Sequence, residues 1–146
     1  MTTIQTIVTA ILLTSINTCY SQTTEPCSDN NPIDLKLKIC LDSTENYTTY
    51  GMLHCTGQAM DLWDNELNKY YKLLMSKLND NEKNKLRTSQ RKWLEYRDAE
   101  FATSSLIYDN MQGTMWTIVS LDGKMQIVKE RALSLKSYYS SLTLDK

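Results

Sequence analysis

Glycine and proline are scarce in this chain. Its 146 residues include four glycines and two prolines, and no strand-like alternation of apolar and polar residues is present. Closely spaced turns and alternating strands are typical of sandwiches and barrels, so these all-β folds are excluded. Helical spacing of apolar residues instead dominates the sequence after Asn31.

The motifs of common catalytic sites are also missing. No GxSxG elbow, HExxH helix, P-loop or GxGxxG turn occurs. The single histidine, His54, adjoins Cys55, and neighbouring residues on a helix point in different directions, which disfavours a nucleophile–base pair. The carboxylates Asp61, Asp64 and Glu66 lie near basic residues, as on a solvated helix face. We therefore predict no enzyme activity, no cofactor and no metal site.

A strong excess of either charge is absent as well. Sixteen basic and seventeen acidic residues give a formal net charge of −1. Nucleic-acid binding needs a basic surface that neutralises phosphates, so we do not expect nucleic acid as a partner. Because the net charge is small, long-range electrostatic attraction of a charged partner should also be weak.

The first 21 residues contain no charged side chain. Ile4 to Ile16 is mostly apolar, but it is shorter than the roughly 20 residues that cross a bilayer. Such a segment is typical of a secretory signal peptide. We predict a signal peptide over residues 1–21, cleaved after Ser21, and an exported protein in the periplasm or outside the cell. The alternative is a buried N-terminal helix.

A lipid anchor is the less favoured form of export. Cys19 follows a weak version of a lipid-attachment box, in which Asn17 and Thr18 occupy positions where small residues are expected. After cleavage, residues 22–31 are polar and predict a disordered leader. Residues 32–146 then form the helical domain.

Three cysteines remain after the predicted cleavage: Cys27, Cys40 and Cys55. None has the CxxC spacing of a zinc site. A Cys40–Cys55 disulfide would stabilise the fold by about 3 kcal/mol on the chain-entropy model and would leave Cys27 unpaired. If the protein is not exported, three reduced thiols are the alternative.

Two helices are predicted in the first half of the domain. Asn31 can cap the first, with Pro32 in its first turn, and its apolar spacing covers Ile33 to Leu41. Thr48 or Thr49 can cap the second, which runs to about Leu78. The apolar stripe of this second helix steps by three or four residues and comprises Met52, Cys55, Ala59, Trp63, Leu67, Tyr70, Leu74 and Leu78.

Two more helices are predicted in the second half. Asn79 and Glu82 have the spacing of a capping box that starts the third helix. The pattern breaks over residues 108–113, and Thr114 can cap a fourth helix. The predicted fold is all-α, a small antiparallel bundle of three long helices plus one short N-terminal helix.

The third helix carries polar residues within its apolar stripe. Gln90, Trp93 and Arg97 are spaced three and then four residues apart, so they share one face. A buried arginine needs a partner, and Asp122 on the fourth helix is our first choice, ahead of Asp64 and Glu130. The favoured interpretation is a network that fixes helix register. The alternative is a polar ligand-binding pocket.

Four sequence elements carry a family resemblance. They are Cys40, a Thr-x-x-Met-x-x-Cys turn ending at Cys55, an Asp-x-x-Leu-Asn-x-x-Tyr stretch starting at Asp64, and a Gln-x-x-Trp-x-x-x-Arg-Asp motif over residues 90–98, with Arg131 farther along. Together they resemble the LprI-like lysozyme inhibitor domain family over Cys40 to Lys136. The resemblance implies an exported, helical bacterial protein that inhibits lysozyme by protein–protein contact.

The family resemblance also has a departure. Many members carry another cysteine pair, and the corresponding positions here look like Phe101 and Gly123. We expect Phe101 to pack against the space left at Gly123.

The residues that we assign to the structural polar network are Gln90, Trp93, Arg97, Asp98, Asp122 and Arg131.

The segment between the third and fourth helices is the candidate partner-binding loop. Residues 107–116 offer aromatic anchors and polar donors, the side-chain types that dominate protein interfaces. The candidates are Tyr108, Asn110, Gln112 and Trp116. The alternative interpretation of this loop is a simple link between two helices. The alternative function of the protein is a structural or interaction module of the cell envelope.

Overall fold

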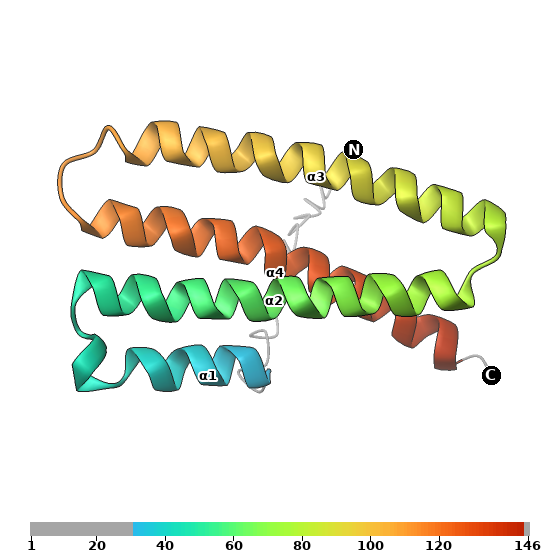
Figure 1. Ribbon diagram of the computed structural model, residues 1–146, viewed down its shortest axis with the longest axis horizontal. Coiled ribbons are helices and arrows are strands. Elements are labelled where there is room, and N and C mark those ends of the chain that lie inside the picture. The colour runs from blue at the N-terminus through green and yellow to red at the C-terminus, as the bar shows by residue number, and fades with distance from the viewer. Residues whose placement is uncertain (1–30, 145–146) are drawn as a thin grey trace, which may run out of the picture.

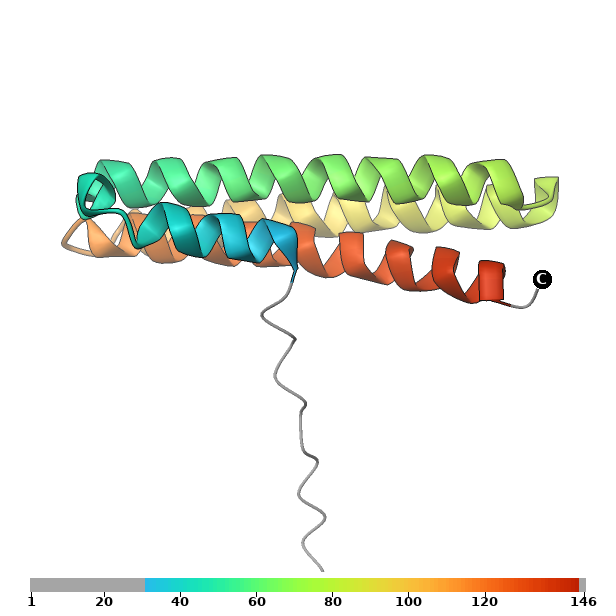
Figure 2. The ribbon, with the colours of Figure 1, turned by 90° about the horizontal axis from the view of Figure 1, so that it is seen from below.

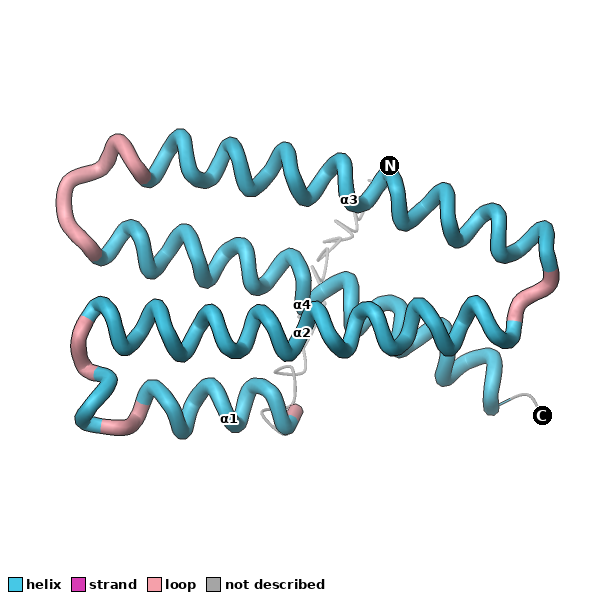
Figure 3. Tube along the Cα trace, viewed as in Figure 1, coloured by secondary structure: helices cyan, strands magenta, loops and turns pink. Residues whose placement is uncertain are grey.

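The computed structural model describes residues 31–144, and within them it contains helices and connecting loops but no strand (Figure 3). Three long helices and a short one form an all-α bundle, as predicted (Figure 1). The predicted signal peptide and nearly all of the leader lie outside the described residues. The elements are α1 (Pro32–Leu41), the 3-10 turn η1 (Thr44–Asn46), α2 (Thr49–Lys77), α3 (Asp80–Tyr108) and α4 (Met115–Leu144).

Helices α1, α2 and α3 begin at capping residues that the sequence predicts, and of the two candidates at α2 it is Thr48 that caps the helix. The Asn31 side chain accepts a hydrogen bond from the Ile33 amide at 2.9 Å, with Pro32 in the first turn of α1. The Thr48 hydroxyl caps α2. At α3, both hydrogen bonds of the Asn79–Glu82 capping box are present, at 2.9 and 3.0 Å. These bonds satisfy amides that have no partner inside a helix, and this explains why each helix starts there.

The core lies mainly between α2 and α4, with α1 packed beside them. Figure 2 shows α1 alongside both of these helices. An ion pair joins α1 to α4, with 2.8 Å between Lys129 Nζ and Asp34 Oδ2. The same ammonium lies 5.5 Å from the ring centre of Trp63, which is 2% exposed. The other buried apolar side chains of this core are Ile33, Ala59, Leu67, Leu74, Met125, Val128, Ala132 and Leu135.

The outer helix α3 is covered on one side only. It contacts α4, and a hydrogen bond of 3.0 Å joins the hydroxyls of Ser104 and Ser120 across that contact. No residue of its 29 is fully buried. Leu86, Trp93 and Phe101 are half-buried against the edge of the core. The expectation of a buried stripe on this helix is therefore wrong, because too few neighbours surround α3.

Gly123 is an exposed position of α4 rather than a filled gap. A Cβ atom built there meets no atom within 4 Å. The expectation that Phe101 packs against this glycine is therefore wrong. Phe101 instead has the ammonium of Lys124 at 5.9 Å from its ring centre.

Two alanine substitutions should have opposite effects on stability. Gly123→Ala should stabilise the protein by up to about 1 kcal/mol, because alanine favours the helix and meets no neighbour. Gly51→Ala should destabilise it by about 1 to 3 kcal/mol, since an added Cβ would lie 2.5 Å from the Asn46 Cα atom. Urea denaturation of both variants measures the two changes. Equal effects would contradict the packing of η1 against the start of α2.

No helix within residues 31–144 is both long and apolar enough to cross a membrane.

Candidate functional site

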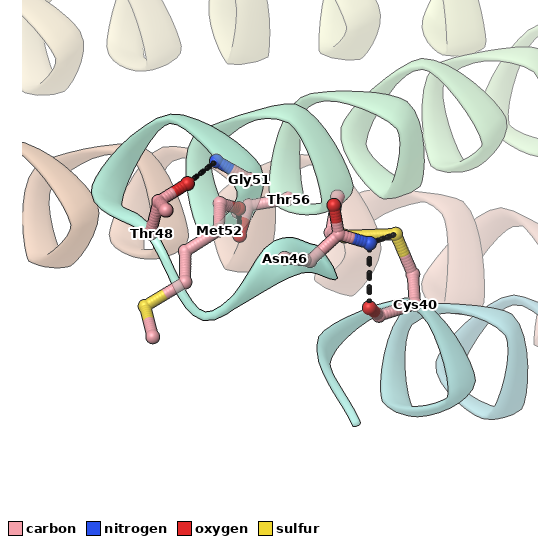
Figure 4. The surroundings of a disulfide bond; sticks show 7 residues. Cys40, Asn46, Thr48, Gly51, Met52 and Thr56 are labelled. Atoms are coloured by element: carbon pink, nitrogen blue, oxygen red, sulfur yellow. Dashed lines mark hydrogen bonds between the residues drawn. A yellow bond between two sulfur atoms is a disulfide. The ribbon is translucent and has the colours of Figure 1, made fainter. Parts of the chain in front are cut away.

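A disulfide between Cys40 and Cys55 joins the end of α1 to the second turn of α2, with 5.8 Å between the two Cα atoms. This pairing is the predicted one. The Asn46 side-chain amide donates to the Cys40 carbonyl at 2.9 Å (Figure 4). Nearby, the Thr48 hydroxyl accepts from the Gly51 amide at 3.0 Å. The turn η1 is thus held from both sides against the start of α2.

The loop between α3 and α4 lies at the same end of the bundle as η1 (Figure 1). A hydrogen bond of 3.1 Å joins the hydroxyls of Thr49 and Thr114, so the loop touches the first residue of α2. The rings of Tyr108 and Trp116 stack across the base of the loop, with centres 5.8 Å apart. Gly113 has a φ of +100°, a conformation that favours glycine. The loop is therefore tied to the helices at its base.

We call this end of the bundle the tip and define it as residues 106–116 together with Tyr47 and Tyr50. Large apolar side chains are exposed here, and Tyr50 is the extreme case at 81%. Clustered exposed aromatic and methionine side chains are typical of surfaces that bind proteins. The other exposed apolar side chains of the tip are Tyr47, Leu106, Ile107, Met111 and Met115.

The four predicted partner-binding residues have different environments at the tip. Tyr108 and Trp116 are half-buried by their mutual stacking, whereas Gln112 is exposed. Asn110 donates its side-chain amide to the Leu106 carbonyl at 2.6 Å and so closes the end of α3. Sequence reasoning missed Tyr47 and Tyr50, because only the fold brings η1 and the start of α2 to the same end of the bundle as this loop (Figure 1).

The polar residues of α3 meet Arg131 of α4. The Arg131 guanidinium donates to the Gln90 side-chain oxygen and to the Ser89 hydroxyl, each at 3.1 Å. It also lies 6.0 Å from the ring centre of Trp93, and Arg97 lies 5.4 Å from the same ring. Burial lowers the pKa of Arg131, although an arginine remains charged at neutral pH. The structure thus brings Gln90, Trp93, Arg97 and Arg131 together.

The expected partner of Arg97 was wrong. Its guanidinium binds Asp98 of its own helix, with distances of 2.9 and 2.7 Å to one carboxylate oxygen. Asp122 is exposed on α4, and no ion pair within the described residues joins Arg97 to Asp122, Asp64 or Glu130. Because the Arg97 side chain is 26% exposed, water shares its solvation and an acid from another helix is not required.

Within the described part of the chain, no group of three or more histidine, cysteine, aspartate or glutamate residues is placed to hold a metal ion.

Comparison with protein families gives a match that covers most of the residues described above. Residues 40–135 match the family described as lysozyme inhibitor LprI. The chain belongs to this LprI family. The predicted family resemblance is thereby confirmed, and the matched residues include the disulfide, the polar contacts around Trp93 and the loop of the tip.

A solved structure supports the fold of this LprI family member. An uncharacterised protein from Burkholderia thailandensis is 30% identical in sequence, with a TM-score of 0.73. The match covers 77% of this chain but only 55% of the other, so the chain spans about half the length of that protein. No curated protein matches the chain.

Proposed function

We propose that this LprI family member is an exported inhibitor that binds lysozyme through its tip. The observation that carries the proposal is the set of exposed aromatic and methionine side chains at the tip, in a chain that belongs to a lysozyme inhibitor family. In this proposal the protein acts by occupying a surface and catalyses no reaction. Export is supported by the uncharged, apolar segment over residues 1–21.

The shape and rigidity of the tip suit an inhibitor. Lysozyme cleaves glycan between two carboxylates in a cleft, so an inhibitor must block that cleft with a projecting surface. The stacked Tyr108 and Trp116 and the Thr49–Thr114 hydrogen bond hold the loop before any partner arrives. A preorganised loop loses less conformational freedom on binding, which favours affinity.

A lysis assay tests this function. Purified protein, residues 22–146, is titrated into lysozyme acting on suspended bacterial cells, and turbidity reports cell-wall cleavage. We expect slower lysis at micromolar protein. Met111→Asp with Met115→Asp should raise the concentration needed by roughly tenfold or more, because charges would replace apolar contacts at the centre of an interface.

The matched control places the same changes at the other end of α4. Leu142 and Leu144 are also exposed, at 41% and 84%, so Leu142→Asp with Leu144→Asp adds the same charge without touching the tip. This control should inhibit like the parent protein. Undiminished lysis with the parent protein would refute the lysozyme assignment, and equal inhibition by all three proteins would refute the tip as its site.

A further inference from the structure

A groove separate from the tip runs between α2 and α3. Its volume is about 760 Å³, which falls within the range of pockets that hold ligands. On α3 the lining extends from Asn84 to Arg97, which at 1.5 Å per residue is about 20 Å of helix. Four lining side chains are largely apolar: Leu67 and Tyr71 from α2, and Trp93 and Leu94 from α3.

Three arginines also line this groove, and two of them have only neutral partners. Arg87 donates to the Asn84 side-chain oxygen at 2.8 Å. Arg91 donates to the Thr88 hydroxyl at 3.5 Å. Both contacts lie within α3, and both arginines are exposed. Their charges are therefore available to an external ligand.

The groove has little acid of its own. Asp64 is the carboxylate among its lining residues, and Asp64 already accepts a hydrogen bond from the Asn68 side chain at 2.8 Å. The third arginine, Arg97, binds Asp98, a residue outside the lining. The groove consequently presents a net positive rim around an apolar floor.

The positive charge is a local property of α3 that the whole-chain charge hides. Residues 83–97 contain six lysines and arginines and one acid, Glu95, although the chain as a whole carries a net charge of −1. The same helix has no fully buried residue. Its apolar face is thus left partly uncovered along a strongly basic stretch.

We propose that this groove binds an acidic amphipathic helix of a partner protein. The groove is bounded by two long helices, and a third helix can lay an apolar face between them with anchors at i, i+3 or i+4 and i+7. The apolar floor would receive those anchors. The arginine rim selects glutamate and aspartate on the flanks of the incoming helix, because guanidinium groups pair well with carboxylates.

A designed peptide tests the proposal. The probe is a labelled helical peptide of about 18 residues, roughly 27 Å long, with leucine at the anchor positions and glutamate beside them. Fluorescence anisotropy should show binding that weakens in about 1 M NaCl, where screening limits charge interactions to about 3 Å. Arg87→Glu with Arg91→Glu should weaken binding by roughly tenfold or more.

Two further peptides distinguish binding of an acidic amphipathic helix from binding of any polyanion. In one, lysine replaces every glutamate, and it should not bind. In the other, glycine replaces every leucine, and it should bind at least roughly tenfold more weakly because it lacks the apolar anchors. No binding of the leucine–glutamate peptide would overturn the proposal. Equal binding of the glycine peptide would also overturn it, in favour of a general polyanion surface.

A protein control has the same charge change outside the groove. Lys72 and Lys136 are exposed and do not line it, so Lys72→Glu with Lys136→Glu should leave peptide binding within about twofold of the parent at moderate salt. Circular dichroism checks that every variant is folded. The tip variant Met111→Asp with Met115→Asp should bind the peptide normally. The proposal for the groove and the proposal for the tip are therefore tested independently.

Discussion

Trp63→Ala should lower the free energy of unfolding by about 3 to 5 kcal/mol, as expected for loss of a large buried aromatic side chain. Trp63 is 2% exposed in the core shared by α1, α2 and α4. Its removal would leave a cavity in the core cluster that includes Ile33 and Val128, and would take away the ring that lies 5.5 Å from the Lys129 ammonium. Urea denaturation followed by circular dichroism measures the change.

Trp63→Phe is the matched control for this prediction. The Trp63 indole nitrogen is buried without a hydrogen-bond partner among the described residues. A buried donor without an acceptor carries a desolvation penalty, and phenylalanine removes that donor while keeping most of the apolar volume. We expect Trp63→Phe to cost about 1 to 2 kcal/mol. A loss below about 1 kcal/mol for Trp63→Ala would contradict the packing described for this core.

Cys40→Ser with Cys55→Ser should lower the free energy of unfolding by about 3 kcal/mol, since the disulfide closes a loop between residues 15 apart. For a domain of this size, the loss corresponds to roughly 12 °C in the melting temperature. The bond also holds α1 and η1 beside α2. We therefore expect the tip to lose part of its inhibition in the lysis assay as well.

Reduction of the parent protein provides the control for the disulfide. A thiol reductant should bring the parent to the stability of the double serine variant and should leave that variant unchanged. Calorimetry with and without reductant measures both. A serine variant that melts within about 2 °C of the oxidised parent would show that the cross-link contributes little to stability.

Local sequence signals determined the helices and most of their ends. Capping depends on residues a few positions apart, so Asn31 and the Asn79–Glu82 pair could be recognised without tertiary information, and the cap of the second helix could be narrowed to Thr48 or Thr49. The apolar spacing of the second helix identified Trp63, Leu67 and Leu74 as core residues, and these are buried. The Cys40–Cys55 disulfide was the pairing expected from the sequence, with three reduced thiols as the alternative, and the structure contains it.

The burial and the contacts of α3 could not be predicted from capping residues and apolar spacing. Apolar spacing shows which face of a helix is apolar but not how many neighbours cover it. The Arg97 side chain therefore seemed to need Asp122, whereas partial exposure lets it bind Asp98. The contact of Arg131 with Gln90 joins residues 41 apart in sequence, and no local pattern indicates such a pair.

The sequence alone determined that the chain is helical, where its helices start and which family it resembles, because hydrogen-bond capping, apolar periodicity and motif spacing are local properties. Tertiary structure decided which side chains are exposed together on one surface. Only packing brings the start of α2 against the end of the α3–α4 loop, where the hydroxyls of Thr49 and Thr114 are hydrogen-bonded. Only the one-sided cover of α3 leaves a basic groove open, because exposure depends on how whole helices are placed against each other.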